Sequence, residues 1–444
     1  MWRKAHALAG SRASMHDSAH AMPYYPVADR VSALGISILL FSCIFLQRFG
    51  IPASETQTIA IPFVIAYLVF GYMLLRGRLF VSPGLLVAYC AAMALITLSL
   101  MISSVAPSLM SYFYLLSVYL LYVFKLRYRE GVFEHAVDAY QNFMLVAAVI
   151  GIVQFLGQFV VDRELVFPID TFLPPEILFT ETFNVIIPLT YESEIMKSNG
   201  VFFLEPSFFS QFLAIAIVAE LTTRQRMRRL LVYGGALLVS YSGTGLALVV
   251  VLLPWILYRR GNIQLLVWGF IGIGFLAIAG DALNLEMLTK RIGEFEETES
   301  SGFARFISPI LLIRDFLLDS AQSFFFGLGA GTIEDVMAAS RVNSYLAHDP
   351  TWIKLLIEYG FLAFMAVMIY VLMALGHGNR HPVIFVAVML TFLLLGGYLL
   401  NGTMHVLFVA LMAWHSDPTR AGVVAPARPI RPRPIRLQHE ESPR

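Results

Sequence analysis

Charged residues are scarce in this chain: they occupy 14% of its 444 positions, about half the share found in soluble domains. Apolar residues make up 58%, which excludes both a disordered chain and a single water-exposed globule. The net charge is only +1, so we expect no nucleic-acid partner. Cysteine is almost absent as well. Cys43 and Cys90 both lie in apolar runs, which argues against a disulfide framework and a cysteine-based zinc site.

Long apolar runs fill the chain instead. A transmembrane helix needs about 20 apolar residues, and twelve stretches approach that composition. We therefore predict an all-α polytopic membrane protein with about 12 transmembrane helices. The runs lie near residues 32–47, 58–75, 83–104, 107–124, 136–161, 202–221, 230–241, 245–258, 263–280, 351–375, 383–400 and 403–415.

The distribution of positive charge predicts how these helices cross the membrane. The seventh and eighth runs are short, and an alternative joins them into one helix, which leaves eleven spans. Cytoplasmic connections collect lysine and arginine. With twelve spans and a cytoplasmic N-terminus, more than two thirds of the 31 Lys and Arg residues fall on the cytoplasmic side. Eleven spans would place Arg259, Arg260 and the arginine-rich tail outside, so the sequence favours twelve spans with both termini cytoplasmic.

This topology divides the chain into regions and leaves two long loops on the outer side. Loops of that length without a structure of their own are typically functional or disordered. The regions are a cytoplasmic N-terminal segment at 1–30, helices 1–9 at 31–280 with an outer loop at 162–200, a large outer loop at 281–350, helices 10–12 at 351–416, and a disordered cytoplasmic tail rich in proline and arginine at 417–444.

Arginines in the large outer loop are candidates for binding an anion. Arg305 and Arg314 stand among phenylalanine, isoleucine and leucine, where a guanidinium needs an anion or a path to water. One interpretation is an interfacial helix whose arginines contact lipid phosphate or Asp315. The other is a clamp for a pyrophosphate, which the forked donors of arginine fit well. The Gly-x-Gly-x-Gly run at 327–331 resembles a phosphate-cradling loop but is more typical of a tight turn.

Titratable residues cluster where the large loop enters the tenth span. His348 and Asp349 precede the span, and a histidine beside a carboxylate at a membrane surface is a candidate general base. A solvated loop end is the alternative. Glu358 lies about two turns inside the span, where an acid is costly and therefore a candidate functional residue. It could also simply pair with Lys354 four residues earlier.

Two breaks in apolar runs form a third group of candidates. Glu205 is followed by Pro206 at the start of the sixth span, where proline frees backbone carbonyls and the carboxylate would lie at the mouth of the bundle. Ser242 and Thr244, each followed by glycine, interrupt the chain between the seventh and eighth runs, and free N–H groups there can hold an anion. For both, a plain helix break is the alternative.

Four stretches, taken in order, resemble the O-antigen polymerase and ligase superfamily, and within it the Wzy-type exopolysaccharide polymerases. The number of spans and the position of the large loop agree with that family. The likeness covers about 195–375, and earlier residues are similar by hydropathy only. The stretches are 197–207, from Lys197 through Glu205-Pro206-Ser207; 242–246, with Ser242-Gly243-Thr244-Gly245; Arg305 followed by the glycine run at 326–332; and 348–360, from His348-Asp349 through Glu358-Tyr359-Gly360.

The sequence departs from the family pattern at two positions. Lys197 stands where the family more often has arginine. His348 lies one residue further from the glycine of the Glu-x-Gly motif than the family's histidine does, and Asp349 takes the expected place. Either His348 or Asp349 is therefore the candidate base.

The resemblance implies a GT-C-like bundle in the bacterial inner membrane, with a large periplasmic loop between helices 9 and 10 and an active site that faces the periplasm. It implies a metal-independent glycosyltransferase that joins undecaprenyl-pyrophosphate-linked repeats in exopolysaccharide or O-antigen biosynthesis. No cofactor is expected. The implied site comprises His348 or Asp349 as the base, Arg305, Arg314, Arg341 and Lys197 around the pyrophosphate, and Glu205, Ser242, Thr244 and Glu358 as further pocket residues.

The same resemblance names partners and an alternative activity. The partners are lipid-linked saccharides, membrane lipid, and further proteins of chain-length control and export. An O-antigen ligase would use the same donor and transfer it to lipid A-core. A transporter or flippase would need charged residues deep in several spans and symmetric broken helices in two halves, a pattern that this sequence lacks.

Overall fold

The computed structural model describes residues 28–54, 57–103, 108–179, 183–190, 193–260, 303–304, 307–342, 348–376 and 381–415. Four expectations fall elsewhere. The predicted ninth span at 263–280, most of the N-terminal segment, Arg305 and the tail at 417–444 lie outside the described residues.

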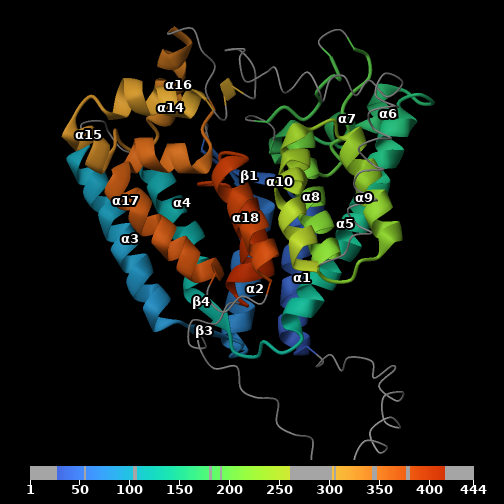
Figure 1. Cartoon of the computed structure of the whole chain (residues 1–444), viewed down its shortest axis with the longest axis horizontal. Coiled ribbons are helices and arrows are strands. Elements are labelled where there is room, and N and C mark those ends of the chain that lie inside the picture. Colours follow the sequence, from blue (N-terminus) through green and yellow to red (C-terminus); the bar gives the residue numbers. More distant parts are fainter. Residues whose placement is uncertain are drawn as a thin grey trace, which may run out of the picture.

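Helices dominate the described part of the chain, and most of them run roughly side by side in one bundle (Figure 1). The helices are α1 (Arg30–Phe45), α2 (Ile61–Leu75), α3 (Pro83–Ile102), α4 (Leu109–Leu120), η1 (Leu121–Val123), α5 (Val132–Gly157), α6 (Arg163–Val166), α7 (Pro168–Phe172), η2 (Pro175–Ile177), α8 (Pro206–Thr222), α9 (Met227–Val239), α10 (Gly243–Arg260), α14 (Ser308–Leu312), η4 (Ile313–Leu317), α15 (Ala321–Phe326), α16 (Ile333–Val342), α17 (Thr351–Gly376), α18 (Pro382–Leu394), α19 (Gly402–Phe408) and η5 (Val409–Ala413). The strands are β1 (Gly50–Ser54), β2 (Gln57–Ala60), β3 (Leu79–Val81) and β4 (Phe124–Leu126).

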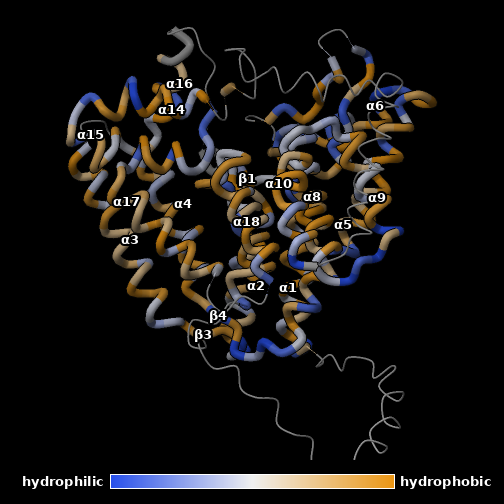
Figure 2. The backbone as a smooth tube through the Cα atoms, viewed as in Figure 1, coloured by the Kyte–Doolittle hydropathy of each residue, from blue (hydrophilic) through white to orange (hydrophobic). Residues whose placement is uncertain are grey.

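Apolar helices make this a membrane-embedded protein. Within the described residues, α3, α5 and α17 are long and apolar enough to cross a bilayer, with mean hydropathies of 2.4, 1.7 and 2.2. Shorter apolar helices of 10–17 residues accompany them. Hydrophobic residues follow the helices while hydrophilic ones gather toward the two ends of the bundle (Figure 2). The predicted runs outside 263–280 each coincide with a helix, and the two short runs at 230–241 and 245–258 form separate helices.

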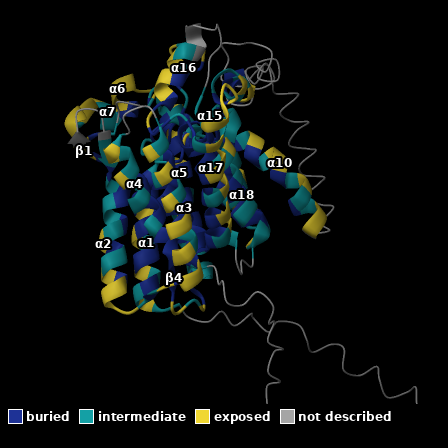
Figure 3. Ribbon diagram, turned by 90° about the vertical axis from the view of Figure 1, so that its left-hand side faces the viewer, coloured by how far each residue is buried: buried dark blue, intermediate teal, exposed yellow. Residues whose placement is uncertain are grey.

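The outward faces of the bundle are apolar and exposed. Exposed residues run along α2, α3 and α10 (Figure 3). Leu68 on α2 and Val87 on α3 are each 69% exposed. Side chains of this kind are unfavourable in water and suit the acyl chains of a bilayer. The exposed apolar faces therefore agree with a membrane environment around the helices.

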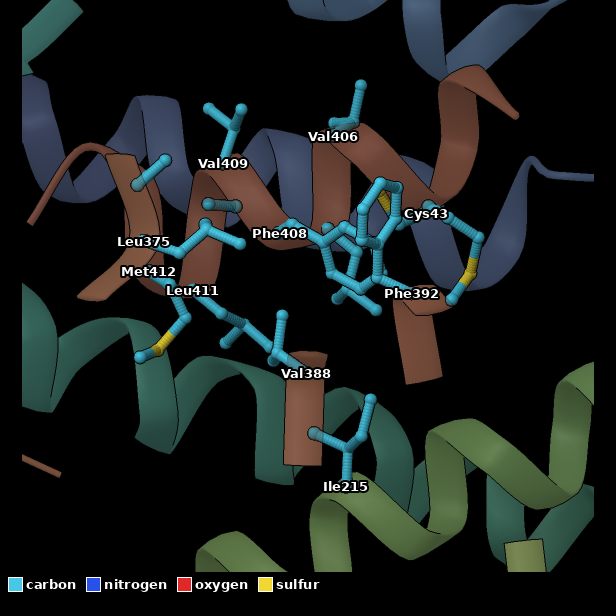
Figure 4. Close-up of a cluster of buried hydrophobic side chains, with 14 of the residues drawn as sticks. Cys43, Ile215, Leu375, Val388, Phe392, Val406, Phe408, Val409, Leu411 and Met412 are labelled. Carbon is cyan, nitrogen blue, oxygen red and sulfur yellow. The ribbon is translucent and has the colours of Figure 1, made fainter. Parts of the chain in front are cut away.

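The core lies where helices from both ends of the chain meet. Cys43 of α1, Ile215 of α8 and Leu375 of α17 pack with residues of α18, α19 and η5, and all three are fully buried (Figure 4). Cys43 is a free thiol in this cluster, as its apolar run predicts. The first and last helices of the described chain are thus packed together in one core.

The two ends of the bundle are closed in different ways. At one end, β3 pairs antiparallel with β4, and the buried Lys125 donates hydrogen bonds to the carbonyls of Ala374 and Ala413 near the ends of α17 and η5. At the other end, β1 and β2 form an antiparallel hairpin between α1 and α2. The all-α prediction misses these short strands, because isolated backbone pairing between loops leaves no periodic signal in the sequence.

The large outer loop contributes a helical layer at the hairpin end. This part of the chain contains α14, the π-helix η4 and α15, which lie with α16 over α3 and α17 (Figure 1). The hydroxyl of Ser99 on α3 donates to the carbonyl of Phe326. The hydroxyl of Ser103, just after α3, donates to the carbonyl of Leu328. These short helices therefore cover the bundle end and are tied to it.

Candidate functional site

A cavity of about 800 Å³ lies at the covered end of the bundle, where α8 and α17 begin. Its walls come from β2, the start of α4, the connection before α8, the α9–α10 connection, α16, the start of α17 and the turn before α19. Six residues predicted from the sequence line this one cavity: Lys197, Glu205, Ser242, Thr244, His348 and Asp349.

Lys197 is placed by a buried polar network behind it. The neighbouring Ser198 donates to the carbonyl of Gly151 and to the side chain of Gln154, each at 2.8 Å. Gln154 on α5 in turn donates to the side chain of Asn199 at 2.9 Å. These groups are almost fully buried, and satisfied networks of this kind hold a backbone in one conformation. The buried network therefore holds the backbone beside Lys197 in place, and Lys197 lines the cavity.

Glu205 immediately precedes α8 and lines the cavity. Its Oε1 accepts a hydrogen bond from the backbone N–H of Asn184 at 3.1 Å, and its Oε2 accepts one from the Ser207 hydroxyl at 2.8 Å. The helix begins at Pro206, so the break predicted from the sequence lies here. A carboxylate has about four lone-pair positions, so Glu205 keeps acceptor capacity for a ligand.

The α9–α10 connection packs tightly against α8. The Thr244 hydroxyl lies 3.1 Å from those of both Ser242 and Ser210, and the Gly245 N–H donates to the Ser210 hydroxyl at 3.2 Å. A Cβ at Gly245 would overlap the backbone carbonyl of Ser210. Tyr241, just before the break, has a φ of 45°, a strained value of the kind that gathers at functional sites.

We expect Gly245→Ala to lower stability by about 1–3 kcal/mol, because α10 must move away from α8 to admit the methyl group. The matched control is Gly234→Ala on α9, where an added Cβ meets nothing within 4 Å. That variant should keep or raise stability, since alanine favours a helix over glycine by about 0.5–1 kcal/mol. Melting temperatures in one detergent measure both. Equal melting temperatures for the two variants would contradict this packing.

Another part of the cavity wall carries the titratable side chains at the start of α17. Asp349 and Lys354 form an ion pair with Nζ–Oδ2 at 3.5 Å, and both side chains are only partly exposed. Thr351 fixes this helix start, because its N–H and hydroxyl both donate to the carbonyl of Gly396 at 3.1 Å. His348 lines the same wall, and its backbone N–H donates to the carbonyl of Ala304. A candidate base and a cation are therefore held side by side.

The glycine run at 327–331 supports α17 and does not line the cavity. Gly360 interrupts α17 with a φ of 76°, and Gly327 packs directly against it with a φ of 77°. The N–H groups of Leu328 and Gly329 donate to the carbonyls of Ile357 and Glu358, at 2.8 and 3.0 Å. The run thus satisfies carbonyls that the helix break leaves free. Of the two interpretations, the turn fits this geometry better than the phosphate cradle.

Glu358 lies behind the cavity wall, in place of the lining position expected for it. Its side chain is 1% exposed, and no side chain among the described residues donates a hydrogen bond to either carboxylate oxygen. The carboxylate faces Lys354 and the backbone N–H groups of Gly331 and Ile333. The glycine run packs against the backbone of Glu358 and against the break at Gly360. Glu358 is therefore positioned to hold Lys354 by its charge.

The three predicted loop arginines differ in where they lie. The Arg314 side chain is 67% exposed, forms an ion pair with Asp315 at 2.7 Å and does not line the cavity. That pair matches the first of the two interpretations given for it. Arg341 belongs to α16, and its side chain is not among those described. Arg305 lies outside the described residues.

Several lining residues were not predicted from the sequence. Lys354 was considered only as a partner of Glu358, although a lysine near the start of an apolar span is itself unusual. Glu334 of α16 also lines the cavity, and it belongs to no sequence motif. The aromatic side chains of Phe179, Phe183 and Tyr398 also line the cavity, and nothing in their spacing marks them, because they converge only in the folded chain.

The cavity thus combines a candidate base, cations, carboxylates, hydroxyls and aromatic rings, a composition typical of a binding site for a polar organic ligand. A general base beside a cation can take a proton while the cation stabilises a developing anion. Neither the family models nor the curated proteins searched gave a match to this chain.

Proposed function

We propose that the chain is an integral-membrane polysaccharide polymerase that joins undecaprenyl-pyrophosphate-linked oligosaccharide repeats on the periplasmic face of the inner membrane. In this proposal it is a metal-independent glycosyltransferase with about 12 transmembrane helices. Both termini are cytoplasmic, and the cavity is the active site.

One observation carries the proposal. Residues from three of the four stretches that resemble the polymerase family meet at one cavity, although they lie as far apart in sequence as Lys197 and Asp349. The remaining stretch contains the glycine run, which packs against the helix break at Gly360. A chance likeness of short motifs would have no reason to converge in space.

The proposed reaction transfers a glycosyl chain between two lipid-linked saccharides. His348 or Asp349 takes the proton from an acceptor hydroxyl, and that oxygen attacks the anomeric carbon of the donor. The bond from this carbon to undecaprenyl pyrophosphate breaks, and the diphosphate leaves with its negative charge. Lys197 and Lys354, together with Arg305 and Arg341, are proposed to stabilise that charge. A direct displacement of this kind inverts the anomeric centre.

The charge distribution supports the proposed orientation. The end of the bundle opposite the cavity carries the α2–β3, β4–α5 and α8–α9 connections (Figure 1). These connections hold six of the 15 arginines of the described residues: Arg76, Arg78, Arg127, Arg129, Arg224 and Arg226. Arg228 and Arg229 follow in the first turn of α9. Positive charge is typical of the cytoplasmic side, which supports a periplasmic position for the cavity.

The lipid-linked products of a strain that lacks this chain test the proposal. We expect single lipid-linked repeats to accumulate on the periplasmic side and long polymer to disappear. The wild-type gene should reverse both changes. Thin-layer chromatography and mass spectrometry of the lipid extract measure this.

Other product patterns would reject the polymerase. Long chains that remain attached to undecaprenyl pyrophosphate would identify a ligase, and repeats trapped on the inner leaflet would identify a flippase. An unchanged profile would contradict any role in this pathway.

A further inference from the structure

Four aromatic rings form a continuous row along one side of the cavity. Successive ring centroids lie 5.4 Å apart for Phe179 and Phe183, 5.6 Å for Phe183 and Phe208, and 5.4 Å for Phe208 and Tyr398. All four residues line the cavity. Phe208 and Tyr398 are buried, whereas Phe179 and Phe183 are only partly buried. The row thus ends in two partly exposed rings, Phe179 and Phe183, which continue into the two buried rings.

Hydrogen bonds and a ring contact hold residues of this row in place. The Phe179 N–H donates to the carbonyl of Arg48 at 2.7 Å, which ties the row to the end of α1. The Phe183 ring meets the Phe208 ring edge to face, at 87°, an arrangement that aromatic quadrupoles favour. The Tyr398 hydroxyl donates to the side chain of Gln211 on α8 at 2.6 Å. The open rings are therefore presented in fixed positions and need little ordering when a ligand binds.

Polar acceptors border this row. Glu205 accepts a hydrogen bond from Asn184, the residue after Phe183, so its carboxylate lies beside the open rings. The Ser207, Ser242 and Thr244 hydroxyls line the same cavity. An apolar ring face next to hydroxyl-binding groups matches the two kinds of surface on a pyranose. The C–H groups of a sugar are slightly positive and favour the negative face of an aromatic ring, and its hydroxyls donate to a carboxylate.

We propose that Phe179, Phe183 and Glu205 form a saccharide subsite that binds one pyranose ring of the lipid-linked substrate by stacking and by hydrogen bonds to Glu205. This inference rests on the proposed function, because it names the ring-binding part of the same cavity. A lipid tail fits the subsite less well. Its methylene groups would pack on the rings, but they would displace water from the remaining acceptor positions of the Glu205 carboxylate without replacing its hydrogen bonds, which is costly.

Saturation-transfer difference NMR of the full chain in lipid nanodiscs tests the subsite. The probes are methyl β-D-glucopyranoside, methyl β-D-galactopyranoside and methyl α-D-mannopyranoside. We expect the wild-type chain to saturate the C–H face of at least one probe. Phe183→Leu should weaken the binding of that probe about tenfold, because it keeps apolar volume but removes the ring face. Phe183→Tyr should restore it.

Phe113→Ala is the matched control, since Phe113 is 58% exposed on α4 and does not line the cavity. It should leave the saturation unchanged. The inference is overturned if no probe is saturated by the wild-type chain, or if Phe183→Leu binds as the wild type does. A melting temperature within a few degrees of wild type for Phe183→Leu separates lost stacking from lost fold.

Lipid-linked products of the same variants separate this inference from the proposed function. Polymer from the wild type, with probe binding that does not respond to Phe183→Leu, overturns the saccharide subsite and leaves the polymerase standing. Probe binding that Phe183→Leu abolishes, in a chain whose deletion changes no lipid-linked product, overturns the polymerase and leaves the saccharide subsite standing.

Discussion

Replacing His348 and Asp349 with alanine, one at a time, is expected to slow polymerisation by about 10²–10⁴-fold in at least one of the two variants. Both side chains line the cavity at the start of α17, where an acceptor hydroxyl would enter. Removal of the base leaves the hydroxyl proton without an acceptor during attack. The rate of polymer formation from lipid-linked repeats measures the effect.

Two controls separate proton transfer from a structural effect. Asp349 also pairs with Lys354 at 3.5 Å, so Asp349→Asn, which keeps the shape of the side chain, accompanies Asp349→Ala. Added imidazole should partly restore His348→Ala if this histidine is the base. Wild-type rates in both alanine variants would mean that neither side chain accepts the proton.

Lys354→Met is expected to lower the rate by about 10²–10³-fold, the cost of removing one donor that stabilises a developing anion. Lys354 lies on the cavity wall between Asp349 and the buried Glu358. Methionine keeps the length and apolar stem of the side chain but removes its charge. The leaving diphosphate then loses a cation that the fold holds in place, and single lipid-linked repeats should accumulate.

Lys354→Met also leaves the Glu358 carboxylate without the cation it faces, which can destabilise the chain. The double variant Lys354→Met/Glu358→Gln removes both charges and should recover the melting temperature without recovering the rate. Arg314→Ala is the external control, because Arg314 is exposed and lies off the cavity. Its rate should stay within about twofold of wild type, as surface ion pairs contribute little. The reverse pattern, with Arg314 essential and Lys354 dispensable, would place the diphosphate in the outer helices.

Local patterns in the sequence predicted most of the helices and part of the cavity. An apolar run is a local feature of the sequence, so the positions of the helices could be predicted directly. The two short runs on either side of Ser242 and Thr244 accordingly form the separate helices α9 and α10. Pro206 marks the start of α8 for the same local reason. The six predicted residues that line the cavity, Lys197 among them, come from motifs that interrupt such runs.

Tertiary geometry decided what the sequence could not. The depth of Glu358 in its span was predicted, but its direction depends on the break at Gly360 and on the glycine run packed against it. Phe183 belongs to a loop with no periodicity, and only folding brings it beside Phe208. The support of Lys197 by Gln154 joins residues from α5 and a distant loop. None of these contacts follows from spacing along the chain.

Elongation of a lipid-linked repeat by the purified chain in nanodiscs is the most direct measurement of whether this cavity transfers glycosyl groups. We predict a ladder of polymer from the wild type and from Arg314→Ala, and only unreacted single repeats from Lys354→Met. A wild-type protein that forms no ladder, or a ladder that Lys354→Met leaves unchanged, would contradict the account.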